Sequence, residues 1–146
     1  MNYTTLQANI ADWLNRDDLT TVIPQFIALT EAELNRTLRV RQMLRNADTT
    51  ISSVSVTLPT DFLELRHVTL SSKNTPLYQA SYAELDDIRR NKNVAAQPTH
   101  VAVFKNKLEF APVPDQSYTC EIVYYQQLSA LSSSTATNWL SDDHHD

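Results

Sequence analysis

The most constraining feature of this sequence is a change in the spacing of its apolar residues between Leu44 and Asp48. Before this point they recur every three or four residues, which is typical of amphipathic helices. After it they mostly alternate with polar residues, which is typical of half-buried strands. We therefore predict an α+β fold, with an N-terminal antiparallel helical pair packed with a largely antiparallel sheet and one short inserted helix.

The helical pair is expected within residues 1–46. Thr4 or Thr5 can cap a first helix, whose apolar positions are Tyr3, Leu6, Ile10, Trp13 and Leu14. A second helix is expected from about Thr21, with an apolar stripe formed by Ile23, Phe26, Ile27, Thr30, Leu34 and Leu38. Glu31 is predicted to lie off this stripe and Leu34 to be buried. The short polar connection, Asn15–Thr20, predicts that the two helices run antiparallel.

Residues 47–128 are expected to form the sheet. Strands are predicted at Asp48–Thr57, with a bulge or an edge position, at Phe62–Leu70 and at Leu77-Tyr78. Pro98–Leu128 predicts three more strands, the first two joined by a turn at Lys105-Asn106-Lys107. Asn106 is the predicted turn residue, because asparagine tolerates the left-handed conformation.

The inserted helix, Tyr82–Arg90 within the segment 81–91, begins with a capping box formed by Ser81 and Glu84. A Ser/Thr-rich loop follows the last strand, and Thr137 or Asn138 can cap a further helix that begins at Trp139. We expect this end, with Trp139 as its anchor, to fold back onto the domain or onto a neighbouring copy. The whole chain, 1–146, is predicted to be one domain, in which 129–146 is a loop and the start of a C-terminal helical arm.

The 146 residues include no glycine, which excludes several binding motifs. A P-loop, a GxGxxG dinucleotide fingerprint and a GxSxG nucleophile elbow all need glycine for close backbone approach. Tight turns are therefore expected to use Asn and Asp. The formal net charge of −5 argues against a protein whose main task is to bind phosphate backbones. The sequence also has no apolar run of membrane-spanning length and no signal-peptide pattern, so an intracellular origin is expected.

Few residues are candidates for catalysis or metal binding. The run Asp142-Asp143-His144-His145-Asp146 has the composition of a metal site, but zinc ligands are normally several residues apart, and nothing places His100 nearby. Cys120 is interpreted as a small apolar residue in a strand, and His67 as a core or flanking histidine. We predict no catalytic, cofactor or metal site, and expect that the protein is not an enzyme.

Four arginines, Arg36, Arg39, Arg41 and Arg45, are expected at the end of the second helix. Cations there complement the helix dipole, which is a structural role. On a helix, Arg36 and Arg39 would point away from Arg41 and Arg45, so the four do not form one stripe. They remain candidates for partner contact, and they support an alternative function as a small nucleic-acid-binding or regulatory module.

Segments spread over most of the chain resemble the head–tail adaptor, or head-completion connector, proteins of tailed bacteriophages. They are YTTLQANIADWLNRDDLTTVIPQFIALTEAELNRTLRVRQM, LPTDFLELRHVTL, LYQASYAELDDIRR, LEFAPVPDQSYTCEIVYYQQLSALS and TNWL. Two features depart from the family pattern: its members often have glycine in the hairpin turn, and they usually continue beyond the NWL segment into one or two helices. The chain is therefore expected to be either a fragment or a short member.

The resemblance implies a structural virion protein without catalysis. It implies docking onto the portal ring, usually as a dodecamer, and connection of that ring to a tail or nozzle protein. Genomic DNA would pass through the ring without sequence-specific binding, and no membrane is involved. The protein would be made in the host cytoplasm and would end at the head–tail junction of the virion. Besides the four arginines, Trp139 and Leu140 are the residues expected to contact partners.

Overall fold

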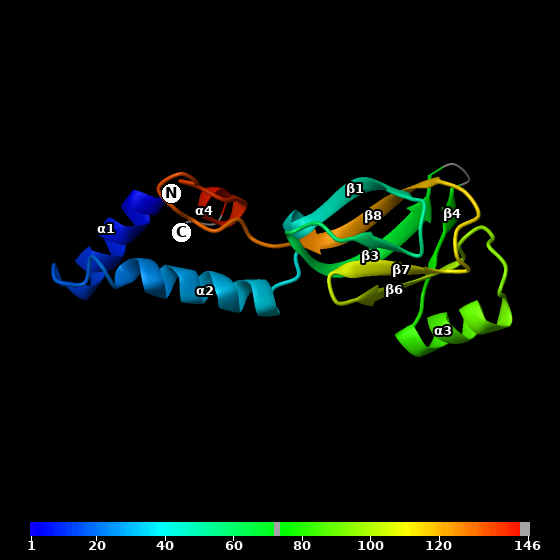
Figure 1. Ribbon diagram of the computed structural model, residues 1–146. Coiled ribbons are helices and arrows are strands. Elements are labelled where there is room, and N and C mark those ends of the chain that lie inside the picture. The colour runs from blue at the N-terminus through cyan, green and yellow to red at the C-terminus, as the bar shows by residue number, and fades with distance from the viewer. Residues whose placement is uncertain (72–73, 144–146) are drawn as a thin grey trace. The chain divides into compact units, whose positions relative to one another are not determined.

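A computed structural model describes residues 1–71 and 74–143 of the chain (Figure 1). The backbone forms two compact units. The first comprises Met1–Met43 and Gln127–Asp146 and is called the helical unit; the second comprises Leu44–Gln126 and is called the sandwich unit. The predicted α+β class is confirmed, with helices first, antiparallel-rich sheets after them and one short inserted helix. Packing of the helices on the sheet, and a single adaptor domain, stay predictions.

The helical unit begins with α1 (Tyr3–Leu14), and the chain then turns into α2 (Ile23–Thr37), which lies at an oblique angle to α1 (Figure 1). The cap of α1 is Asn2 rather than Thr4 or Thr5, because the Asn2 side chain accepts a hydrogen bond of 2.8 Å from the Thr5 N–H. Asn15 ends α1 with φ 49°. The unit also contains a 3₁₀ helix, η1 (Arg41–Met43), and a short helix, α4 (Trp139–Asp143).

The apolar stripe predicted for α2 is only partly buried. Ile23 and Ile27 are buried, whereas Leu34 is half-buried and Phe26 is exposed. Glu31, which was predicted to lie off the stripe, is buried. The prediction for Glu31 is wrong because segments distant in the sequence cover this face of α2, as described below.

The sandwich unit has two four-stranded sheets (Figure 1). The first has the order β1 (Leu44–Ile51), β8 (Tyr118–Gln126), β3 (Phe62–Leu70) and β4 (Thr75–Pro76). The second has the order β2 (Ser55–Thr57), β7 (Lys107–Ala111), β6 (His100–Phe104) and β5 (Tyr78–Gln79). All neighbours are antiparallel except β5 and β6. The single strand predicted over Asp48–Thr57 is wrong: the chain leaves the first sheet after Ile51 and enters the second at Ser55, and both strands are edge strands.

The core lies between the two sheets. Branched and aromatic side chains from both sheets form one cluster, including Ile51, Val68 and Ile122 from the first sheet and Val101, Leu108 and Phe110 from the second. The helix α3 (Tyr82–Asn91) packs on the second sheet through Leu85, which contacts Ala102 and Ala111. The capping box of Ser81 and Glu84 is confirmed. Because successive residues of a strand face opposite sides, the second sheet is covered on both faces.

The hairpin between β6 and β7 turns without glycine. The residue with positive φ is Lys105, at 53°, and not Asn106 as predicted. Asn15 and Asn74 also adopt positive φ, so asparagine occupies positions in turns where glycine is commonly found. A lysine in this region carries a steric cost that glycine does not.

We expect Lys105→Gly to stabilise the protein by about 0.5–1 kcal/mol, because relief of the left-handed strain exceeds the entropy that glycine loses on folding. Asn106→Gly is the matched control and should destabilise by a similar amount, since it only adds freedom to the unfolded chain. Urea titration of both variants measures the difference. Changes of the same sign in the two variants would contradict this account of the turn.

Candidate interaction surface

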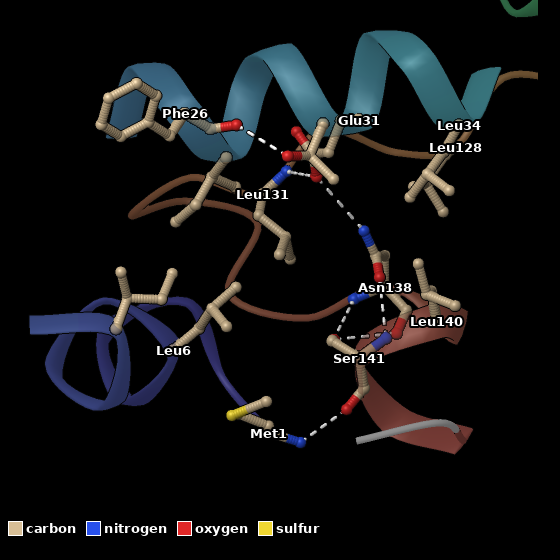
Figure 2. Close-up of a pocket in the computed structure, with 13 residues that line it drawn as sticks. Met1, Leu6, Phe26, Glu31, Leu34, Leu128, Leu131, Asn138, Leu140 and Ser141 are labelled. Carbon is tan, nitrogen blue, oxygen red and sulfur yellow. Dashed lines mark hydrogen bonds between the residues drawn. The ribbon is translucent and has the colours of Figure 1, made fainter. Parts of the chain in front are cut away.

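An apolar groove of about 270 Å³ lies within the helical unit (Figure 2). Side chains from α1, α2, the segment 128–131 and α4 form its walls. The apolar lining consists of Met1, Leu6, Ile10, Phe26, Ile27, Leu34, Leu128, Leu131 and Leu140. The polar residues of the wall are Thr30, Glu31, Asn138 and Ser141.

Glu31 connects α2 to the segment that returns after the last strand (Figure 2). Its Oε1 atom accepts hydrogen bonds from the Leu131 N–H at 2.9 Å and from the Asn138 side-chain amide at 3.5 Å. One turn further on, Asn35 Oδ1 accepts a hydrogen bond of 2.7 Å from the Leu128 N–H. Two polar side chains, four residues apart on one face of α2, thus supply partners for backbone groups that have none in a helix or sheet. Their i, i+4 spacing places them on one face of α2, but the sequence does not show which segment covers that face.

Asn138 caps α4, as the sequence predicted. Its Oδ1 accepts a hydrogen bond from the Ser141 N–H at 3.0 Å, and Ser141 Oγ accepts one from the Asn138 N–H at 2.9 Å. The Asn138 side chain also donates to the Ser129 carbonyl at 2.9 Å. The prediction that this end folds back onto the chain is confirmed, with Asn138 and Ser141 buried. Trp139 and Leu140 are half-buried, and their contact with a partner stays a prediction.

The outer surface of the helical pair is unusually apolar. Trp13 is 93% exposed, and Leu14, Phe26 and Leu29 are also at least half exposed. Trp13 and Leu14 line a second hollow of about 250 Å³ together with Asn9 and Ile10. The sequence placed Trp13 and Leu14 at apolar positions of the first helix, and the structure shows that α1 has no fully buried residue. Large apolar patches that face solvent mark sites of protein–protein contact. Trp13, Leu14, Phe26 and Leu29, together with the groove, are called the apolar surface.

The four predicted arginines do not share a helix. Because α2 ends at Thr37, only Arg36 lies on it, where it pairs with Glu33. Arg39 follows the helix and donates to the carbonyls of Asn35, at 2.9 Å, and Leu38, at 2.6 Å. Arg39 therefore satisfies carbonyls at the helix C-terminus, as cations commonly do.

Arg41 lies in η1, and Arg45 lies in β1. Arg45 donates to Gln126 Oε1 at 3.1 Å and lies 3.8 Å from Asp61 Oδ2. The sequence placed all four on one helix, which is wrong; they lie on a helix, a loop, a 3₁₀ turn and a strand. Since Arg36, Arg39 and Arg45 already have partners in the chain, these contacts weigh against the nucleic-acid-binding alternative. Partner contact by the arginines stays a prediction.

Cys120 lies in the sandwich core and is fully buried. Burial raises the pKa of its thiol to about 11, and the nearby Asp48 acts in the same direction. The thiol is thus protonated at neutral pH and is no nucleophile, in keeping with the structural role predicted for it.

This pKa shift predicts a loss of stability in alkaline solution. The folded state holds the proton more tightly than the unfolded chain, so the contribution is complete below pH 9 and is lost as the pH rises through 11. At pH 10 the loss should be about 1.4 kcal/mol. Cys120→Ala is the control, and the difference between the two pH profiles isolates the thiol from buried tyrosines. Parallel profiles between pH 8 and about 11 would contradict the shift.

The remaining predictions about chemistry concern histidine and the acidic terminus. His67 is exposed, which leaves the flanking position of the two that were predicted for it, and His100 is half-buried beside Tyr78. Within residues 1–71 and 74–143, no group of three or more His, Cys, Asp or Glu side chains could hold a metal ion. His144, His145 and Asp146 lie outside the described residues. No helix in the described part of the chain is long and apolar enough to span a membrane.

A small sandwich joined to a helical pair with a broad apolar surface is typical of proteins that bind other proteins. The comparison with known families agrees: the family model of the SU10 adaptor protein matches residues 1–146. The chain belongs to this family of phage structural adaptors, which is not a class of enzymes, and the predicted resemblance is confirmed. No curated protein matches the chain.

Proposed function

We propose that this protein is a head–tail adaptor, which docks onto the portal ring of the capsid and connects it to a tail or nozzle protein. Membership of the adaptor family supports the proposal, and the observation that carries it is the apolar surface of the helical unit. The protein would act as a ring of copies, a dodecamer, at the head–tail junction of the virion, with the genomic DNA passing through it.

Energetics favour burial of the apolar surface in an assembly. Complete burial of one Leu- or Phe-sized side chain is worth roughly 1.5–3 kcal/mol. Trp13, Leu14, Phe26 and Leu29 gain little of this in the isolated chain, because each is at least half exposed. A partner that covers them gains that free energy, and tryptophan is a frequent hot-spot residue.

A ring closes by heterologous contacts, in which one surface of each copy meets a different surface of the next. If each contact is weak, free copies stay monomers or weak oligomers. A portal that binds several copies side by side raises their local concentration and favours closure. The arginines, Trp139 and Leu140 are further candidates for these contacts.

The test is binding of the purified protein to the portal ring of the same phage. We expect Trp13→Ala to weaken binding by about 2 kcal/mol or more, roughly thirtyfold, while leaving the melting temperature unchanged. Val94→Ala is the matched control, because Val94 is an exposed apolar residue of the sandwich unit, with 76% of its surface accessible. Sedimentation of the mixtures measures both. Failure of the unmodified protein to bind, or equal binding by Trp13→Ala, would refute the proposal.

A further inference from the structure

The strand β1 is a long, regular sheet edge. It pairs with β8 over eight residues, from Leu44↔Tyr125 to Ile51↔Tyr118, without a shift of register. In the described part of the chain no strand pairs with its other side. The remaining edge strands of the two sheets are much shorter: β2 has three residues, and β4 and β5 have two each. Among the described strands, β1 is therefore the longest whose outer side is unpaired along its whole length; β3 also has an open side before Thr69, but its register with β8 shifts twice.

The register identifies the groups that point outward. The Ser71 N–H donates to the Thr119 carbonyl at 2.9 Å, so this carbonyl points toward the β3 side of β8. Because backbone groups alternate along a strand, those of Cys120 and Ile122 point toward β1, where they face Thr49 and Ala47. The N–H and C=O groups of the alternate residues of β1, which are Leu44, Asn46, Asp48 and Thr50, consequently point away from the sheet.

Natural proteins usually protect such an edge with lysine, proline, a bulge or a covering segment. Residues 44–51, LRNADTTI, contain no lysine or proline, and their register has no bulge; their charged residues are Arg45, which donates to Gln126 of β8, and Asp48. Asp48 also lies directly opposite Glu121, and like charges in this position destabilise a sheet. The Asn46 amide donates to Glu121 at 2.7 Å. A further hydrogen-bond donor that approached β1 from its unpaired side would offset the repulsion between the Asp48 and Glu121 carboxylates.

We infer that β1 pairs antiparallel with β1 of a second copy, so that the two first sheets become one continuous sheet. The outward groups of the two copies face each other when Ala47 lies opposite Ala47 of the second copy, which places Asn46 opposite Asp48 and Leu44 opposite Thr50. They also face each other after a shift by two residues in either direction, but one shift places Asp48 opposite Asp48 and the other shortens the overlap to residues 44–48. The register centred on Ala47 avoids both problems, and it places the Asn46 amide opposite each Asp48 carboxylate. The contact is isologous, with a twofold axis at Ala47.

This inference does not depend on the proposed function, and amide hydrogen exchange tests it directly. Exchange is followed by NMR while the protein is concentrated from about 10 μM to about 1 mM, a range in which weak dimers form. The amide protons of Ala47 and Thr49 should be protected throughout, because they bind β8. Those of Asn46 and Asp48 should become protected only as the dimer forms. A protein that stays monomeric, or exchange at Asn46 and Asp48 that is independent of concentration, would overturn the inference.

Two substitutions at one position separate the backbone from the side chain. Asp48→Pro removes an outward N–H without removing a hydrogen bond to β8, and proline is tolerated where the N–H of an edge strand faces solvent. The twofold axis deletes the bond twice, so the dimer dissociation constant should rise about tenfold or more. Asp48→Ala keeps the N–H and should retain most of the dimer. Sedimentation velocity measures both constants.

Two further variants test whether Asp48→Pro acts by unfolding the protein and whether the dimer contact lies elsewhere on the chain. If Asp48→Pro does not fold, Thr50→Pro removes the next outward N–H and should have the same effect on the dimer. Trp13→Ala should leave dimerisation unchanged, because Trp13 belongs to the apolar surface of the helical unit. A dimer that survives the proline substitutions, or that Trp13→Ala dissolves, would place the contact elsewhere and overturn the inference.

Discussion

Replacement of Arg89 by alanine is expected to destabilise the sandwich unit by about 3–4 kcal/mol, because it breaks a largely buried ion pair. Arg89 projects from α3, and its Nη1 atom lies 2.8 Å from Glu109 Oε2. Its Nε and Nη2 atoms donate to the Phe110 carbonyl at 3.1 and 2.8 Å. The side chains of Arg89 and Glu109 are only 17% and 14% exposed, so removal of the guanidinium leaves a carboxylate and a carbonyl with little access to water.

The adjacent residue provides the control. Arg90 pairs with Asp86 on the same helix at 2.6 Å, but its side chain is 73% exposed. Arg90→Ala should cost no more than about 0.5 kcal/mol, as exposed i, i+4 pairs do. Urea unfolding of both variants, followed by circular dichroism of the sheet, gives the comparison. Equal destabilisation by the two substitutions would show that the buried contacts of Arg89 add no more stability than an exposed positive charge on α3.

Glu31→Ala should destabilise the helical unit by about 2–3 kcal/mol, because it leaves the partly buried Leu131 N–H without its acceptor and leaves the Asn138 amide with the Ser129 carbonyl alone. Glu31→Gln retains a carbonyl oxygen and should lose much less, which separates the acceptor from the charge. Limited proteolysis within residues 128–138 reports on release of this segment. Resistance of Glu31→Ala to cleavage, together with unchanged stability, would rule out Glu31 as the residue that holds the segment to α2.

These residues also show which features of the fold could be predicted from the sequence. The capping box of Ser81 and Glu84, and the cap at Asn138, could be predicted because all their atoms come from four consecutive residues. The burial of Glu31 could not be predicted, since its hydrogen-bond partner Leu131 lies 100 positions away in the sequence. The Asp48–Thr57 segment likewise has strand character throughout, and only its two partners, β8 and β7, decide that it divides between two sheets.

The apolar surface was missed for a related reason. Helical spacing shows which side chains share a face, but not whether another element covers that face. Trp13 and Ile27 have the same pattern in the sequence, and they differ because α1 has less protein packed on it. The arginines were misplaced because α2 ends at Thr37 with no proline or glycine to mark the end.

The division of the chain into units has a consequence for its biosynthesis. The helical unit draws on both ends of the sequence, while the sandwich unit is continuous and its ends meet at the Leu44↔Tyr125 pair. A ribosome therefore completes the sandwich before it makes the segment that Glu31 and Asn35 bind. During that interval α1 and α2 have emerged without their last covering segment, and their apolar side chains are open to chaperones. Slowing translation just after residue 126 should lengthen this interval and lower the soluble yield.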